Sequence, residues 1–191
     1  MTVFIRHKST NPASILKRLP NAQIIDVTSK GESPWVRFSP FYPLGDIPVP
    51  FSAGHTSQSV EGIWQALKVF EHCDIDPHKL TITDMKGLKR TVRSFGAVLG
   101  HRKGLHGNEL FPYIEARRSI YLPTYRWALD HKLQKEVAAL LDIMQHHDLV
   151  LLDYETNEDI DDPRKPLSHA GLIKRYLENT WPLSDPPSPA Q

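Results

Sequence analysis

Apolar residues recur at steps of three and four in two segments of the chain, and this spacing predicts helices. In "QSVEGIWQALKVF" (58–70) the apolar positions cover one arc of a helix that Ser59 would cap. A long helix is expected to start near Pro123 and to run through "TYRWALDHKLQKEVAALLDIMQ" (124–145). Both helices would bury their apolar face in a core.

Capping residues predict two more helices, one near each end of the chain. Asn11, followed by Pro12, starts a short helix in "NPASILKRL" (11–19), and Ser168 starts the last one, "HAGLIKRYLEN" (169–179). Three apolar segments are typical of short strands: "TVFIR" (2–6), "AQIIDV" (22–27) and "LVLLDY" (149–154).

Two further segments stand out by composition. Residues 33–58, "SPWVRFSPFYPLGDIPVPFSAGHTSQ", are rich in proline and aromatic residues, which predicts an irregular loop that either binds a ligand or wraps the core. In residues 76–104 another helix is expected to carry cations that either bind a phosphate or form a solvated face. These cations are Lys86, Lys89, Arg90 and Arg93.

Together these elements predict one α+β domain, mostly helical and with a few short strands. Residues 1–34 would form a strand–helix–strand extension packed on the core, and residues 35–181 the main domain. The tail, residues 182–191, is too proline-rich and polar to pack and is expected to be flexible. The 191 residues, 40% of them hydrophobic, suffice for a real core.

The charge and the cysteine content of the chain indicate which partners and which cellular compartment to expect. The formal net charge is +1, which argues against bulk electrostatic binding to nucleic acid or to an anionic membrane. Cys73 is the single cysteine, so no internal disulfide is expected, and no apolar run approaches the roughly 18 residues of a membrane span. Because no cleavable signal pattern follows the N-terminus either, we expect a cytoplasmic protein.

The helix expected over residues 58–70 carries a second, narrow arc of polar residues. Glu61, Gln65 and Lys68 recur at helical spacing, with Glu61 and Lys68 almost one above the other. A carboxylate, an amide and an amine would therefore share one face. They either line a site or form an ion-paired edge of the helix.

An acidic segment, "LLDYETNEDIDD" (151–162), follows the last predicted strand. Carboxylates at the carboxyl end of a strand often line sites in mixed α/β folds, although a solvated loop is the alternative for each residue. Asp153 follows the apolar run directly, so it is expected to be partly buried and to need partners. The ten histidines include no spacing typical of a metal site.

The motif "SVEGIWQALKVF" resembles the signature of the NADAR family (also called YbiA-like), whose helix reads roughly S-x-E-x-x-x-Q-A-x-K. Four other segments within residues 38–178 are similar to that family in the same order: "FSPFYPLGDIPV", "YRWALDHKL", "LLDYETNED" and "SHAGLIKRYL". The chain departs from the family in lacking a Trp-Gly pair after the acidic segment. It also has Pro40 and Ser168 where the family has asparagine.

The resemblance implies a NADAR-like fold and cleavage of an N-glycosidic bond at ribose. The implied substrate is a phosphoribosylated riboflavin intermediate or an ADP-ribosylated guanine, with nucleic acid as a partner only where it carries that base. Neither a metal nor an organic cofactor is expected. The implied catalytic residues are Glu61, Lys68, Asp153 and Asp159. The implied substrate-binding residues are Phe41, Tyr42, Trp64, Gln65, Arg90, Arg93, Asn157 and Ser168.

Lys68 has three possible roles: it holds a phosphate, stabilises ionised Glu61, or attacks an opened ribose. Two other kinds of protein remain open at this stage. One is a module that binds ADP-ribose without cleaving it. The other is an interaction protein in which the polar arc of Glu61, Gln65 and Lys68 contacts a partner protein.

Overall fold

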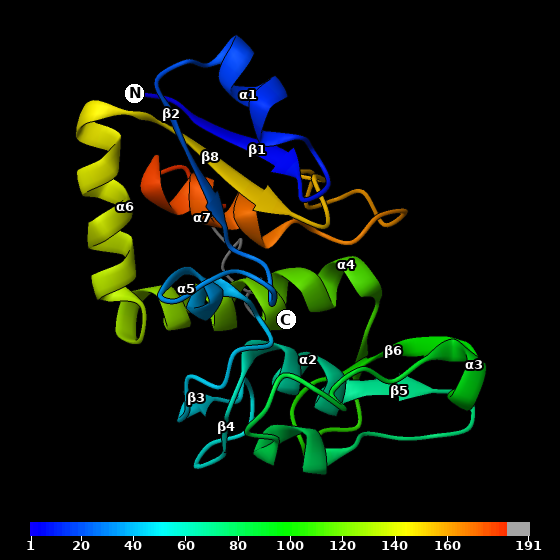
Figure 1. Cartoon of the computed structure of the whole chain (residues 1–191). Coiled ribbons are helices and arrows are strands. Elements are labelled where there is room, and N and C mark those ends of the chain that lie inside the picture. The colour runs from blue at the N-terminus through cyan, green and yellow to red at the C-terminus, as the bar shows by residue number, and fades with distance from the viewer. Residues whose placement is uncertain (183–191) are drawn as a thin grey trace.

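The computed structural model describes residues 1–182, and one half of its fold is built on a small parallel sheet with strand order β1-β8-β2 (Figure 1). Strand β1 is Val3–His7, β2 is Ala22–Asp26, and β8 is Asp148–Asp153. The strand from the C-terminal half thus lies between two strands from the first 26 residues. The N-terminal segment, predicted as an extension packed on the core, supplies two of the three strands of this sheet.

Successive side chains of a strand point to opposite faces of the sheet. The parallel sheet therefore has apolar side chains on both faces, and each face packs against a helix. On one face Val150 and Leu152 contact Ile15 of α1 (Pro12–Arg18). The other face, which includes Leu149 and Leu151, packs in the main core together with α7 (His169–Leu177). Figure 1 shows α1 and α7 on either side of the strands.

A second half of the fold surrounds an antiparallel sheet with strand order β5-β6-β7. Its strands are β5 (Lys68–Phe70), β6 (Val98–Arg102) and β7 (Leu110–Phe111). Helix α2 (Val60–Leu67) precedes β5, and α3 (Val92–Phe95) precedes β6. The short pair β3 (Ile47–Pro48) and β4 (Thr56–Ser57) and the 3-10 turns Trp35–Phe38 and Pro77–Thr81 complete this half.

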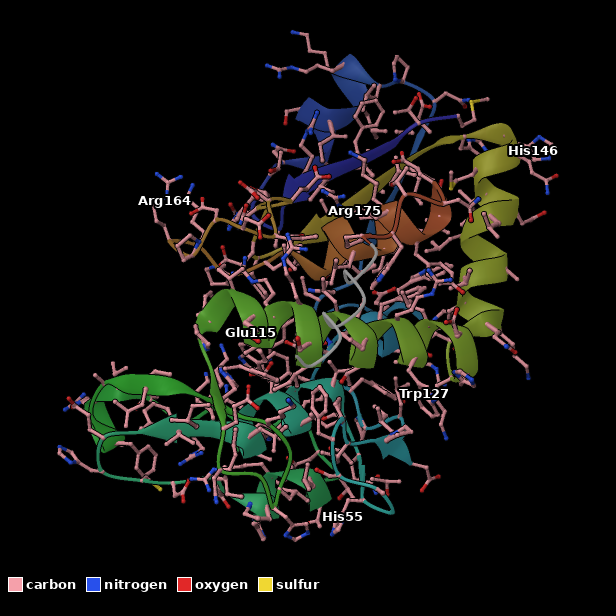
Figure 2. All side chains as sticks on the ribbon, turned by 180° about the vertical axis from the view of Figure 1, so that it is seen from behind. His55, Glu115, Trp127, His146, Arg164 and Arg175 are labelled. Atoms are coloured by element: carbon pink, nitrogen blue, oxygen red, sulfur yellow. The ribbon has the colours of Figure 1, made fainter. Side chains whose placement is uncertain are left out.

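A continuous helical segment runs between the two halves. It consists of α4 (Tyr113–Ala116), a π-helical turn (Arg117–Tyr121) and α5 (Leu122–His131). Glu115 and Trp127, labelled in Figure 2, lie on α4 and α5 of this segment. The chain then turns into α6 (Gln134–His146), which leads to β8.

One hydrophobic core joins the two halves, so the mixed α+β fold is a single compact domain. The core includes Ile5 and Leu151 from the parallel sheet, Ile63 and Leu67 from α2, and Ile120 from the helical segment between them. No helix within residues 1–182 is long and apolar enough to cross a membrane.

The predicted short strands and the capped helices are confirmed. Asn11 Oδ1 accepts from Ala13 N–H at 2.9 Å, and Ser168 Oγ accepts from Gly171 N–H at 3.1 Å, as N-caps do. Residues 183–191 of the predicted tail lie outside the described residues.

Three helix predictions are wrong in their extent. The helix expected over residues 59–70 ends at Leu67, after which the chain forms β5. The basic helix in residues 76–104 is reduced to the single turn α3. The long helix starts ten residues before Pro123 and breaks at 132–133 before α6.

Candidate functional site

A cavity of about 400 Å³ lies where the two halves and the helical segment meet. It opens at the carboxyl ends of β2 and β8, the edge where open α/β sheets bind ligands. Four parts of the chain line it: loop 39–41, α2 with the start of β5, the segment containing α4 and the π-helical turn, and the loops around β2, β8 and α7. Its principal side chains are Ser29, Phe41, Glu61, Trp64, Lys68, Lys89, Tyr113, Arg117, Tyr121, Asp153, Glu155 and His169.

Glu61 projects from the first turn of α2 and is 8% exposed. Its Oε1 accepts from Gln65 Nε2 at 2.8 Å, one helical turn later. Burial raises the pKa of the Glu61 carboxyl, while the Gln65 hydrogen bond and the charges of Lys68 and Lys89 oppose that rise. A carboxyl in this setting holds its proton to higher pH than an exposed one, which suits a group that transfers protons.

Lys68 reaches the same cavity from β5 rather than from the helix. Its backbone is extended (φ −71°, ψ 133°), so it does not stand above Glu61 on one helical face as predicted. Its Nζ lies 5.8 Å from the centre of the Trp64 ring and makes no hydrogen bond or ion pair with any residue of 1–182. Burial lowers the pKa of the Lys68 amine, an effect that Glu61 opposes and Arg90 reinforces.

Asp153 is 2% exposed and is surrounded by donors at the N-terminus of α7. Its Oδ2 accepts from Ser168 Oγ at 2.8 Å and from Ala170 N–H at 3.2 Å, and lies 3.0 Å from His169 Nδ1. Its Oδ1 accepts from Tyr154 N–H at 2.7 Å. Burial alone would raise the pKa of Asp153, but His169 and the other donors lower it to about 2.

His169 is held as an imidazolium by its two neighbours. Its Nε2 lies 2.9 Å from the carbonyl oxygen of Val27, which can only accept, and its Nδ1 faces ionised Asp153. Both ring nitrogens therefore carry a proton. Burial lowers the pKa of His169, but Asp153 and the Val27 carbonyl outweigh burial and raise it overall.

The raised pKa of His169 predicts a loss of stability in alkaline solution. A group whose pKa is higher in the folded than in the unfolded chain stabilises the fold below its unfolded value of about 6.5. That contribution disappears as the pH rises through the folded value. We expect the free energy of unfolding, measured with urea, to fall from pH 6 to pH 9. The fall should be smaller in His169→Gln, and an equal fall in both proteins would contradict the assignment.

Aromatic side chains form the walls of the cavity. Trp64 packs edge-on against Tyr121 and Tyr113, with ring centres 5.6 and 6.0 Å apart. Behind it, the fully buried His101 ring lies 3.7 Å from the Trp64 ring, and burial lowers the pKa of His101 to about 3. His101 is thus a neutral ring that supports Trp64 rather than a proton carrier at neutral pH.

Arg117 fixes the acidic loop beside the cavity and is 2% exposed. Its guanidinium donates to the carbonyl oxygens of Ile160 at 2.6 Å, Asp162 at 3.1 Å and Lys165 at 3.0 Å. The loop that follows β8 is therefore held by its backbone against the π-helical turn. Figure 2 labels Arg164 on this loop, away from the helical segment.

Five of the predicted site residues line the cavity: Phe41, Glu61, Trp64, Lys68 and Asp153. Seven do not: Tyr42, Gln65, Arg90, Arg93, Asn157, Asp159 and Ser168.

Most of these seven have other contacts. Asn157 and Asp159 bond to each other within the loop, where Asp159 N–H donates to Asn157 Oδ1 at 2.9 Å. The Tyr42 ring lies under the guanidinium of Arg37, 5.4 Å away. Arg93 is exposed on α3. These seven residues therefore do not line the cavity, and the site roles assigned to them stay predictions.

The sequence prediction missed several residues of the site. Tyr113, Tyr121 and Arg117 line the cavity but stand outside the quoted motifs, and His169 lines it from within "SHAGLIKRYL" without having been named as a site residue. The only signal for His169 was its place directly after the Ser168 cap. Within residues 1–182 no cluster of three or more histidine, cysteine, aspartate or glutamate side chains is arranged to hold a metal ion.

The fold and the cavity define a mixed α+β protein with a ligand-sized, aromatic-walled cavity that contains a buried glutamate and a half-buried lysine. The chain belongs to the family described as a family of unknown function (DUF6939), whose model matches residues 7–173. The match begins at His7, the last residue of β1, and ends within α7, so it includes β2 but only the end of β1. No curated protein and no solved structure matches the chain. The resemblance to the NADAR family therefore rests on the residues quoted above.

Proposed function

We propose that the protein hydrolyses the N-glycosidic bond between a base and ribose in a phosphoribosylated or ADP-ribosylated substrate. One observation carries the proposal: Glu61 and Lys68, matched to the NADAR motif, line one cavity together with Phe41 and Trp64. Its volume of about 400 Å³ lies within the range of small-molecule sites. We propose likewise that the fold is that of the NADAR family.

The chemistry of the bond explains the need for a carboxylate. As the bond from ribose C1 to the base breaks, positive charge develops on the sugar, and water must add to C1 while the base leaves with a proton. Ionised Glu61 stabilises this charge and accepts a proton from the attacking group. The aromatic walls stack on the base.

Asp153 supports this site without performing the proton transfer. Its two oxygens accept from Ser168, Ala170 and Tyr154 and pair with His169, so it stays ionised and fixed. Together with the His169 imidazolium it forms an ion pair at the wall of the cavity. We assign the acid–base role to Glu61 alone.

On this proposal the Lys68 amine attacks ribose C1, and the bond from C1 to the base breaks. Ionised Glu61 takes a proton from the attacking amine and passes it to the departing base. The ribose ring opens to give an imine with Lys68, and water then hydrolyses that imine and frees the lysine. A half-buried lysine with a lowered pKa and no ion pair within residues 1–182 is suited to this role. Lys68→Met should reduce release of the base at saturating substrate by about 10³-fold or more. Borohydride should trap a ribose adduct on the wild-type chain and none on the variant, as intact-protein mass spectrometry would report.

Lys89 provides the matched control for Lys68. It is exposed at the rim of the cavity, with Nζ 5.4 Å from the centre of the Phe41 ring, where it can contact a phosphate. Lys89→Met should raise KM and leave turnover at saturation near the wild-type value. If Lys68→Met behaves like Lys89→Met, Lys68 is a phosphate ligand and its role as nucleophile is refuted.

The function is tested by incubating the protein with ribosylated pyrimidines and with ADP-ribosylated guanosine. Mass spectrometry then detects any free base. Release of the base by the wild-type chain supports the proposal, and absence of release from every member of the panel counts against it.

A second candidate is a module that binds ADP-ribose without cleaving it. The state of Asp153 favours this candidate, because its oxygens already accept from several donors and are not open to a substrate. Glu61, with a single hydrogen-bond donor, is then the one buried carboxylate of the cavity left for catalysis among the described residues. Such a module would bind its ligand equally well in the wild type and in Glu61→Gln. It would release no base in either.

A further inference from the structure

The amide of Gln65 is held in one orientation between Glu61 and the backbone of Arg90. Its Nε2 donates to Glu61 Oε1 at 2.8 Å, and its Oε1 accepts from Arg90 N–H at 3.1 Å. In the flipped amide, the NH₂ group would face the Arg90 donor and the oxygen would face the carboxylate. Only the observed orientation satisfies both neighbours. Gln65 is 4% exposed, so water does not compete for these contacts.

Arg90 also determines where α2 ends. Its guanidinium donates to the carbonyl oxygens of Gln65 at 3.2 Å, Lys68 at 2.6 Å and Asp74 at 2.6 Å. The last carbonyl groups of a helix lack partners within the helix, and Arg90 supplies one. The chain therefore leaves the helix at Leu67, and Lys68 takes its extended conformation.

We propose that Gln65 and Arg90 are positioning residues for the reaction of the cavity, an inference that rests on the proposed function. Gln65 keeps the Glu61 carboxylate ionised and oriented. Arg90 locks the Gln65 amide through its N–H and turns Lys68 toward the cavity through its guanidinium. Neither residue lines the cavity, so both act through their neighbours rather than on the substrate.

Charged and titratable groups from several elements surround Glu61. Lys68 at the start of β5 and Lys89 in the loop before α3 favour its ionised form, and Tyr121 of the π-helical turn faces it. Burial raises the pKa of Glu61, and the hydrogen bond from Gln65 lowers it. Without the Gln65 donor, less opposes the rise that burial causes in the pKa of Glu61. The carboxyl should then hold its proton to higher pH.

The test is an NMR titration of the full chain labelled with ¹³C in its glutamate carboxyl groups. The Glu61 signal is assigned by its loss in Glu61→Gln. In Gln65→Leu we expect the Glu61 titration midpoint to move upward by roughly one pH unit. The acidic limb of the pH–rate profile should move with it. Gln23→Leu, on the exposed side of β2, is the control and should change neither. An unchanged midpoint in folded Gln65→Leu overturns the proposal.

A second variant covers the case in which Gln65→Leu fails to fold because Arg90 N–H loses its acceptor. Gln65→Glu has nearly the same size and keeps that acceptor. It places a second carboxyl beside Glu61, so the pair should titrate in two steps with one midpoint raised. Titration of Glu61 at its wild-type midpoint in this variant also overturns the proposal.

The titration separates this inference from the proposed function because it needs no substrate. If the midpoint moves but no base is released from any substrate, the positioning of Glu61 stands and the assigned reaction fails. If base is released and both Gln65 variants keep the wild-type midpoint and pH–rate profile, the positioning role alone fails.

Discussion

Glu61→Gln is expected to abolish release of the free base while leaving the fold nearly intact. Glutamine is almost isosteric with glutamate, and its amide oxygen can accept from Gln65 Nε2 as the carboxylate does. The free energy of unfolding should therefore change by no more than about 1 kcal/mol. The variant lacks the negative charge that stabilises the sugar and accepts a proton, so the rate should fall by about 10²-fold or more.

Glu115→Gln is the matched control for this prediction. Glu115 lies on α4, where Figure 2 labels it; its side chain is exposed and lies outside the cavity. The rate of base release and the urea midpoint should both stay at wild-type values. Full activity in Glu61→Gln would mean that the carboxylate is a buried structural group and that the resemblance to a glycosidase motif is misleading.

Asp153→Asn is expected to cause the largest loss of stability. The substitution removes the negative charge that faces buried His169 and leaves an imidazolium without its counter-ion. Breaking a buried ion pair by removing one partner commonly costs about 3–5 kcal/mol, so the free energy of unfolding should fall by about 3 kcal/mol or more. Asp148→Asn, at the half-buried start of the same strand, should cost less than about 1 kcal/mol.

The pH dependence of this difference gives a second measurement. The pKa of Asp153 falls from the ordinary value of 3.8 to about 2 on folding. Its contribution is present above pH 3.8 and is lost as the pH falls toward 2. The difference in stability between wild type and Asp153→Asn should thus be large at pH 6 and shrink below pH 4. A difference that stays constant from pH 6 to pH 2.5 would refute the ion pair.

Elements specified by neighbouring residues could be predicted from the sequence. Asn11 and Ser168 cap their helices through bonds to residues two or three positions later, and the apolar run before Asp153 is a buried strand. These signals lie within a few residues of the elements they define. The same holds for the motif from Glu61 to Lys68, both of which reach the cavity.

Contacts between distant residues could not be predicted in the same way. Helix α2 ends at Leu67, where Arg90, more than twenty residues later, donates to the carbonyl oxygen of Gln65 in the helix and to that of Lys68 just after it. The four cations predicted either to bind a phosphate or to form a solvated face do not act together: Arg90 donates to three carbonyl oxygens, whereas Lys89 lines the cavity. The pairing of β1 and β2 with β8 joins segments more than 120 residues apart, so the place of the N-terminal strands in the sheet had no local signal.

The central claim is that this cavity cleaves the bond between ribose and a base. The most direct measurement is the mass of the products formed from ADP-ribosylated guanosine and from a phosphoribosylated pyrimidine, by the wild-type chain and by Glu61→Gln. We expect the free base and an intact phosphate-bearing sugar from the wild type with one of these substrates, and neither from the variant. Cleavage at a phosphate, equal release by both proteins, or tight binding without any product would contradict the claim.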